Sequence, residues 1–281
     1  MVFDFTKCSS VHFSGLRLNE KGIPEIVGFK KLGFISTPVT VSQYGLYRYQ
    51  LYEKSGGEEH RNAAIKCAEW LAQNAEIRDK DVLWWYNFGS EFLNIKPPWL
   101  CGLAQVLSSW LLYIFRDIDN RWEEIAYKAL NPLFYPVEDG GLINKLNGFT
   151  FFEEYPSNPP SATLNGLMYV LIILHAFSSA GYHRVDSPFK LYTESLAKNL
   201  YRYDTGFWSL YDLWKIKRFS SLQYHWLHIY QLGLLYQITG IKEFYEWHKR
   251  WLIYWKSTNS RFFRVIHKLK EKSIIYTGIK I

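Results

Sequence analysis

Carboxylates and a tyrosine that could carry acid–base chemistry stand together in one short segment. Glu153 and Glu154 are followed by Tyr155 and Pro156, directly after a run of aromatic residues. If that run is a strand, adjacent side chains point to opposite faces, so the two carboxylates do not form a glycosidase pair on their own. We expect one of them to act as a cap or salt-bridge partner, which leaves the other for proton transfer.

Two further clusters have residue types that suit binding, and each also has a structural interpretation. Gln43 and Tyr44 enter a helix behind Ser42, where a helix cap and a core aromatic residue are the alternatives. Tyr211 and Asp212 end a segment rich in turn residues, and they could form a structural hydrogen-bonding pair.

Imidazole and amide groups occur inside predicted helices. His225 and His228 lie three residues apart, a spacing that could hold a metal ion. No cysteine lies nearby and no HExxH motif is present, so we expect no metal there and regard core packing or hydrogen bonding as the alternative. Asn165 lies in an apolar helix, where a satisfied core amide is the structural alternative.

Apolar residues recur with a helical period along most of the chain. Turns near Gly57, Ile118, Gly181 and Gly240 indicate an internal repeat of roughly 60 residues, each repeat a helical hairpin. Such hairpins cannot bury their apolar faces alone, so they must stack into a solenoid or a closed ring. We predict a mainly α fold, an α/α toroid (an incomplete α/α barrel) of about four helical hairpins, because a ring gathers the long connecting loops at one mouth. The predicted helices cover residues 44–53, 58–74, 100–115, 121–130, 162–179, 188–201, 222–238 and 242–255.

Two segments have a different pattern. Asn147-Gly148 separates residues 141–146 from residues 149–155 and predicts a small β-hairpin. Residues 1–38 have no strong period and are interrupted by glycines, which indicates short strands or irregular structure. Ser161 is the predicted N-cap of the helix that follows the hairpin.

Composition limits the class of protein and its surroundings. The chain has 281 residues, 48% of them hydrophobic and 19% aromatic, which excludes a disordered chain. Its net charge of +7 suits an anionic partner. Cys8, Cys67 and Cys101 are widely spaced, so we expect no disulfide framework and a reducing compartment. No secretory signal opens the chain and the most apolar run, residues 164–177, is too short to span a membrane, so we predict a cytoplasmic protein.

The clusters together resemble the C-terminal catalytic domain of the D-glucuronyl C5-epimerase family. The resemblance covers about residues 40–258, and its motifs occur in the order found in the family. They are Ser42-Gln43-Tyr44-Gly45-Leu46, Ala104-Gln105, Glu153-Glu154-Tyr155-Pro156 with Asn165-Gly166, Tyr203-Asp204-Thr205-Gly206, Leu210-Tyr211-Asp212-Leu213, and Tyr224-His225 with His228-Ile229 and Gln231-Leu232.

The resemblance implies a helical α/α toroid that inverts C5 of D-glucuronate units in a glycan, such as a heparosan-like polymer, to L-iduronate without a redox cofactor. It implies a catalytic role for Glu154, Tyr155 and Tyr224. It also implies contacts with substrate, which we assign to Gln43, Tyr44, Arg48, Gln105, Asn165, Tyr211, His225 and His228. No cofactor and no metal are expected, and the partner is an anionic polysaccharide rather than nucleic acid.

The sequence departs from the family at two cationic positions. Trp214 follows Tyr-Asp-Leu and Trp226 follows Tyr-His, where family members often have arginine. The cations that could compensate are Lys215, Lys217, Arg218, Arg48 and His225.

The chemistry of C5 inversion explains why these residue types are needed. The proton beside a carboxylate is weakly acidic, because its removal places a second negative charge next to the first. A cation must neutralise the carboxylate, and two proton-transfer groups must face opposite sides of the sugar ring. We expect Glu154 or Tyr155 on one face and Tyr224 on the other.

Other functions remain open on the sequence alone. A uronate polysaccharide lyase forms the same anion, a glycoside hydrolase would need Glu154 and Asp212 as its carboxylate pair, and a non-catalytic glycan-binding protein needs no proton transfer.

We divide the chain into an N-terminal extension (1–38), the epimerase-like catalytic domain (39–260) and a basic C-terminal tail (261–281). Within the tail, residues 261–272 have the pattern of a basic amphipathic helix, either a solvated surface helix or a peripheral contact with the inner face of the membrane. Whether the chain is a homodimer stays open.

Overall fold

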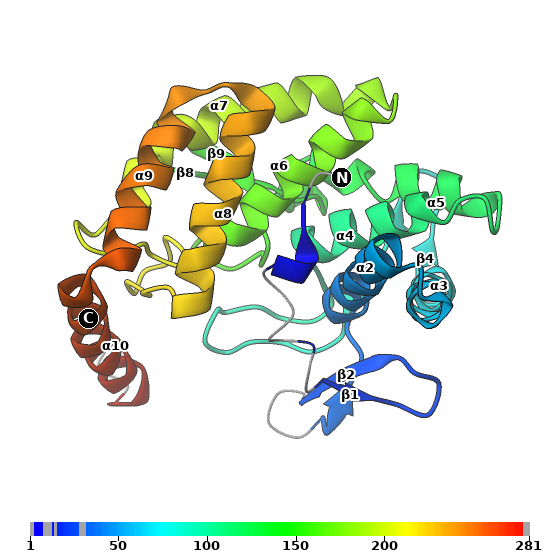
Figure 1. Ribbon diagram of the computed structural model, residues 1–281, viewed down its shortest axis with the longest axis horizontal. Helices are drawn as coiled ribbons and strands as arrows, with labels where there is room; N and C mark the ends of the chain where they lie inside the picture. Colours follow the sequence, from blue (N-terminus) through cyan, green and yellow to red (C-terminus); the bar gives the residue numbers. More distant parts are fainter. Residues whose placement is uncertain (1–2, 8–12, 14–15, 28–31, 278–281) are drawn as a thin grey trace. The chain divides into compact units, whose positions relative to one another are not determined.

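The computed structural model describes residues 3–7, 13, 16–27 and 32–277 (Figure 1), with the side chains of residue 270 and residues 272–277 excepted. The chain divides into two compact units, residues 1–142 and 143–281. Both are built mainly from paired helices with small antiparallel sheets, so the predicted mainly α class is confirmed. Cys8 and the last residues of the predicted basic tail, 278–281, lie outside the described residues.

The first unit contains two helical hairpins and several short strands. Helix α2 pairs with α3 and helix α4 pairs with α5. Thr37 caps α2 by accepting a hydrogen bond from Thr40 N (3.3 Å), and Gly56 ends that helix in the left-handed conformation (φ 71°). The elements are β1 (Arg17–Leu18), β2 (Pro24–Val27), β3 (Phe34–Ile35), α2 (Pro38–Ser55), α3 (Glu58–Gln73), β4 (Glu76–Ile77), β5 (Val82–Leu83), β6 (Trp85–Tyr86), β7 (Trp99–Leu100), α4 (Gly102–Ile114), α5 (Arg121–Lys128) and the 3₁₀ turns Asn131–Phe134 and Val137–Asp139.

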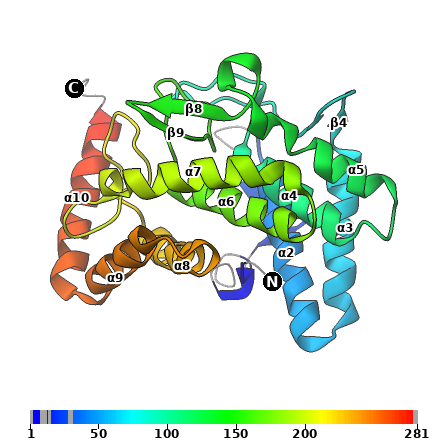
Figure 2. The same cartoon turned by 90° about the horizontal axis from the view of Figure 1, so that it is seen from above.

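The second unit contains the β-hairpin and two further helical hairpins. Asn147 and Gly148 both have positive φ (49° and 80°), as the turn of the predicted hairpin requires. Helices α6 and α7 run side by side, and both contact β9 (Figure 2). The elements are β8 (Ile143–Leu146), β9 (Phe149–Phe152), α6 (Leu164–Ser179), α7 (Asp186–Asn199), α8 (Leu222–Thr239), α9 (Lys242–Lys256), α10 (Thr258–Thr277) and the 3₁₀ turns His183–Val185 and Leu200–Tyr203.

Most predicted elements are present, with two corrections near the hairpin. All eight predicted helices are found, and α6 is the buried helix that its apolar run indicated. The second hairpin strand ends at Phe152, three residues earlier than predicted. The prediction for Ser161 was wrong, because α6 begins at Leu164 with Thr163 as its N-cap. The closure of the hairpins into a toroid stays a prediction.

Candidate active site

Glu153 anchors the loop that follows β9. Its buried carboxylate accepts hydrogen bonds from Ser161 N (2.9 Å), Ser161 Oγ (3.0 Å) and Ala162 N (3.2 Å). Asn144 Nδ2 on β8 donates a further hydrogen bond to it (3.2 Å). Glu153 therefore acts as the structural carboxylate of the pair, and its bonds hold the loop 153–162 against the start of α6.

Glu154 has a different environment, although it is the next residue. Its side chain is buried, and burial raises the pKa of the carboxyl group from 4.5 to about 7, against the opposing effects of a hydrogen bond with Tyr155 and the charge of Arg218. Among the described residues, Glu154 Oε2 has no hydrogen-bond partner. A carboxyl group with a pKa near neutrality is suited to both accept and return a proton.

The backbone of α6 leaves room for this carboxyl group only because residue 166 is glycine. A Cβ atom at Gly166 would lie 2.1 Å from Glu154 Oε2 and 2.9 Å from Glu154 Cδ. Close packing of α6 against Glu154 therefore explains the glycine of the Asn-Gly pair in the sequence motif.

Tyr155, Tyr211 and Tyr224 form one cluster with Glu154. The rings of Tyr211 and Tyr224 pack edge to face, with centroids 4.9 Å apart. Burial and the charge of Glu154 raise the pKa of Tyr211 and of Tyr224, while hydrogen bonding of Tyr211 with Tyr155 and of Tyr224 with Tyr211 opposes this. Both hydroxyl groups are therefore protonated at neutral pH and can donate protons.

Arg218 supplies a cation beside this cluster. Its guanidinium forms an ion pair with the fully buried Asp212 and lies over the Tyr211 ring, 5.1 Å from the ring centroid. Burial lowers the pKa of Arg218, and the neighbouring Tyr211, Tyr155, Glu271 and Glu154 oppose this shift. The second unit thus combines a protonatable carboxyl group, tyrosine hydroxyls and a cation.

Asn165 and Gln231 place two buried amides on α6 and α8. Gln231 Nε2 donates a hydrogen bond to Asn165 O (3.1 Å). Within the described part of the chain, Asn165 Oδ1 and Gln231 Oε1 have no hydrogen-bond partner. Buried acceptors without donors are costly, so these oxygens are suited to accept hydrogen bonds from hydroxyl groups of a ligand or from water.

His225 and His228 are both fully buried and bind protein groups. Ser209 Oγ lies 2.7 Å from His225 Nδ1 and 3.0 Å from His228 Nδ1, and His225 Nε2 lies 3.2 Å from Trp251 O. Burial lowers the pKa of His225 to about 3. These surroundings match the structural interpretation, in which the two histidines pack and form hydrogen bonds in the core. Their substrate-binding role stays a prediction. No group of three or more metal-binding side chains occurs among the described residues.

The remaining candidate residues belong to the first unit. Gln105 is buried and joins α4 to two neighbouring segments. Its Oε1 accepts a hydrogen bond from Trp84 N (3.0 Å), and its Nε2 donates hydrogen bonds to Val82 O (2.9 Å) and Ala129 O (3.0 Å). Tyr44 is buried and accepts a hydrogen bond from Arg48 Nη1 (3.1 Å), while Gln43 is half-buried. Their contacts with substrate stay predictions.

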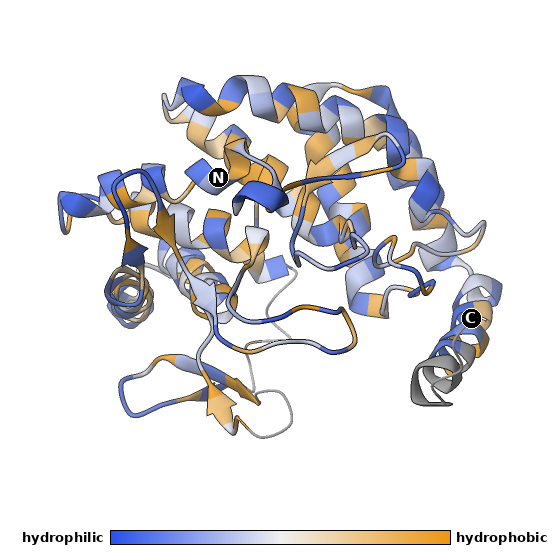
Figure 3. Cartoon of the chain, turned by 180° about the vertical axis from the view of Figure 1, so that it is seen from behind, coloured by the Kyte–Doolittle hydropathy of each residue, from blue (hydrophilic) through white to orange (hydrophobic). Residues whose placement is uncertain are grey.

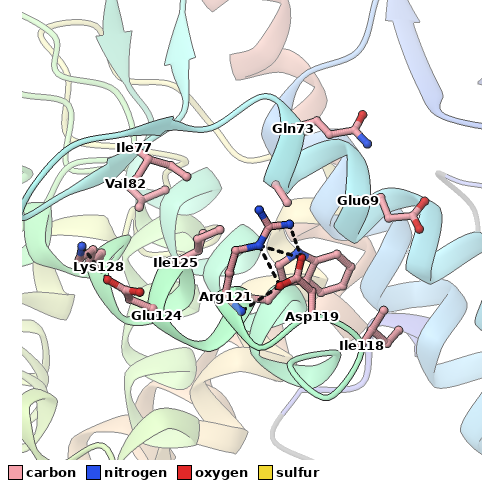
Figure 4. Close-up of a pocket in the computed structure, with 12 residues that line it drawn as sticks. Glu69, Gln73, Ile77, Val82, Ile118, Asp119, Arg121, Glu124, Ile125 and Lys128 are labelled. Atoms are coloured by element: carbon pink, nitrogen blue, oxygen red, sulfur yellow. Dashed lines mark hydrogen bonds and ion pairs between the residues drawn. The ribbon is translucent and has the colours of Figure 1, made fainter.

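Figure 4 shows a groove of about 660 Å³ in the first unit, on the exposed sides of α3 and α5. Val82 and Ile125 are among its apolar lining residues. Two ion pairs also line it, Arg121 with Asp119 and Lys128 with Glu124. None of the predicted site residues lines this groove.

The helical scaffold and the acid–base cluster define the class as a helical protein with a buried carboxyl–tyrosine–arginine site. The family profile described as D-glucuronyl C5-epimerase C-terminus matches residues 78–253. The chain is 30% identical over 207 residues to the D-glucuronyl C5-epimerase of Caenorhabditis elegans, covering 66% of this chain and 33% of that protein. It is also 28% identical over 243 residues to an uncharacterized protein of Methanocaldococcus jannaschii, covering 79% of this chain and 78% of that protein.

The chain therefore belongs to the D-glucuronyl C5-epimerase C-terminal family. The resemblance stated from the motifs is confirmed at the level of the family. The chain spans about a third of the length of the worm enzyme, so the activity of that whole protein is not transferred to this chain by the match.

Proposed function

We propose that the protein inverts C5 of D-glucuronate units in a polysaccharide, by removing a proton from one face of the sugar ring and returning one to the other. The observation that carries the proposal is the buried carboxyl group of Glu154, with a pKa of about 7, in one cluster with three tyrosines and Arg218. Membership of the family supports the same reaction class. We further propose the α/α toroid as the arrangement of the helical hairpins.

Arg218 is the residue that we assign to the substrate carboxylate. The residues at the two positions where family members often have arginine are Trp214, which is buried, and Trp226, which is 39% exposed. Of the five cations named as substitutes, Arg218 is the one whose charge acts on Glu154. A partly buried guanidinium such as that of Arg218 can bind a carboxylate through two parallel hydrogen bonds. These would stabilise the charge that develops on the substrate carboxylate as C5 loses its proton.

The proton transfers follow from the protonation states of the cluster. Ionised Glu154 accepts the C5 proton, and the electron pair moves into the carboxylate held by Arg218. Tyr224, protonated at neutral pH, gives its proton to the opposite face of C5. The hydrogen bonds from Glu154 through Tyr155 and Tyr211 to Tyr224 offer a path by which the proton on Glu154 returns to the Tyr224 oxygen.

Replacement of the two predicted catalytic tyrosines tests this mechanism. Tyr155→Phe and Tyr224→Phe should each lower the conversion of D-glucuronate to L-iduronate units in heparosan by about a hundredfold or more, since general acid–base groups contribute on that scale. Conversion and deuterium at C5 are both read by NMR after incubation in heavy water. Tyr203→Phe is the matched control, because its buried hydroxyl donates a hydrogen bond to Ala162 O (2.7 Å) in the same unit; it should lose stability but keep conversion. Full conversion in both test variants would show that the tyrosines do not transfer the protons.

A uronate lyase and a non-catalytic glycan-binding protein are distinguished by the same incubation. A lyase expels the substituent at C4 and leaves an unsaturated product that absorbs ultraviolet light. A binding protein retains affinity for the polymer without any deuterium at C5. A panel of uronate polymers in place of heparosan alone would identify the glycan that the protein accepts.

The outer face of α10 supports the predicted peripheral contact with an anionic membrane. Phe262, Val265 and Leu269 lie on one face of this helix and are 63%, 44% and 63% exposed, and Figure 3 shows hydrophobic positions along it. No helix in the described ranges is both long and apolar enough to cross a bilayer. We expect the protein to co-sediment with phosphatidylserine vesicles. Leu269→Glu should reduce the fraction of protein that sediments with them at least fivefold, because the change places a charge in the apolar stripe. Leu191→Glu, at an exposed leucine of α7, is the control; equal loss in both variants would contradict the contact.

A further inference from the structure

The inner face of α10 is polar, in contrast to its exposed apolar face. Lys268 Nζ donates a hydrogen bond to Phe219 O (2.9 Å), and the Glu271 carboxylate accepts one from Phe219 N (3.0 Å). Lys268 and Glu271 also pair with each other at 2.6 Å. Glu271 is buried and Lys268 is partly exposed, so α10 holds both backbone polar groups of one residue with a partly buried ion pair.

Phe219 directly follows Arg218, and the backbone of this pair is fixed from several sides. Tyr211 N donates a hydrogen bond to Arg218 O (2.7 Å), and Leu210 forms a β-bridge with Phe219. The Phe219 ring packs on the rings of Phe207 and His267, with centroids 5.7 and 5.1 Å away. The position of the arginine therefore depends on the docking of the C-terminal helix.

We propose that Glu271 is a positioning residue, which acts through Phe219 to hold Arg218 where it receives the carboxylate of the substrate. The proposal rests on the proposed function of the site. Loss of the Glu271 side chain leaves Phe219 N without its acceptor and Lys268 without its counter-ion. The loop from Leu213 to Ser221 then loosens, and the guanidinium of Arg218 spends less time beside Glu154 and Tyr211.

Kinetics of heparosan C5 exchange distinguish positioning from general destabilisation. Glu271→Ala should lower kcat/KM about tenfold to a hundredfold, chiefly through a higher KM, since hydrogen bonds to charged groups have effects on this scale. Glu271→Gln should have a smaller effect, because its amide oxygen can still accept from Phe219 N. Glu246→Ala is the matched control: Glu246 pairs with Lys249 three residues later (3.1 Å) on the exposed surface of α9, and its loss should leave the kinetics unchanged.

A double-mutant cycle tests whether Glu271 acts through Arg218. In an Arg218→Ala background, adding Glu271→Ala should change kcat/KM by less than twofold, because residues that act as a unit are not additive. If the fold-changes in kcat/KM of the two substitutions multiply, the proposal is overturned. It is also overturned if Glu271→Ala has the same kinetics as Glu246→Ala.

Hydrogen exchange separates this inference from the proposed function. Glu271→Ala should raise deuterium uptake in the peptide that spans residues 213–221, and Glu246→Ala should not. If the wild-type protein catalyses no C5 exchange with any uronate polymer, the proposed function fails, yet the uptake measurement still decides the role of α10. Equal uptake in both variants would show that Glu271 does not hold this loop.

Discussion

Glu154→Gln should lower C5 exchange by about a thousandfold, the largest effect expected from any single substitution in the site. The reason is that Gln cannot accept the C5 proton, whereas general acid–base groups contribute roughly 10² to 10⁴ in rate. The change preserves the size of the side chain, so the space left by Gly166 still accommodates it. The measurement is NMR detection of deuterium at C5 of heparosan, with wild-type protein in the same heavy-water buffer.

The same substitution changes how stability depends on pH. The pKa of Glu154 is raised from 4.5 to about 7 in the folded protein, so the folded state holds the proton more tightly than the unfolded state. The contribution of this shift to the free energy of unfolding is fully present below pH 4.5 and is lost as the pH rises through 7. It amounts to on the order of 3 kcal/mol in total. Urea unfolding between pH 4 and 8 should show a smaller fall in the free energy of unfolding for Glu154→Gln than for wild type.

Glu153→Gln is the matched control for the exchange measurement. Burial raises the pKa of Glu153 as well, to about 8, but its carboxylate accepts the hydrogen bonds that close the loop onto α6. We therefore expect this variant to lose stability, and activity only in proportion to the folded fraction. If Glu153→Gln loses exchange in the folded state while Glu154→Gln retains it, the roles assigned to the two carboxylates are reversed.

The helices and the hairpin could be predicted from sequence because their signals are local. The 3.6-residue period of apolar residues, the Asn147-Gly148 turn and the glycine that ends α8 each depend on a few neighbouring residues. The end of β9 could not be placed in this way. The strand stops at Phe152 because Glu153 turns toward the backbone of Ser161, eight residues later, and no local pattern contains that contact.

The site was predictable only in part, for the same reason. Motif residues identified Glu154, Tyr155, Tyr211 and Tyr224, which the structure brings into one cluster. Arg218 could only be named as one of five cations, because it lies in an irregular segment whose path depends on α10. Periodicity gives no direction to a side chain in such a segment, whereas the ion pair with Asp212 and the contacts of Phe219 do.

Gly166→Ala should lower C5 exchange at least a hundredfold and lower the free energy of unfolding by up to about 2 kcal/mol. Alanine favours a helix by about 1 kcal/mol over glycine, but its Cβ atom would meet Glu154 Oε2 at 2.1 Å and Glu154 Cβ at 2.9 Å. Overpacking of this kind costs about 1–3 kcal/mol or more. The carboxyl group must move to relieve the contact, so we expect a loss of activity of at least a hundredfold in protein that is still folded.

Two other helical glycines separate displacement of the carboxyl group from overpacking in general. A Cβ atom at Gly45 in α2 would lie 2.4 Å from Leu111 Cδ2 and 2.9 Å from Cys67 Cβ, so Gly45→Ala should also be destabilising. A Cβ atom at Gly233 in α8 would approach only the His248 ring, at 3.1 Å, and Gly233→Ala should be nearly neutral. Per folded molecule, both controls should exchange C5 at the wild-type rate. If Gly166→Ala does the same, the position of the Glu154 carboxyl group does not limit the reaction.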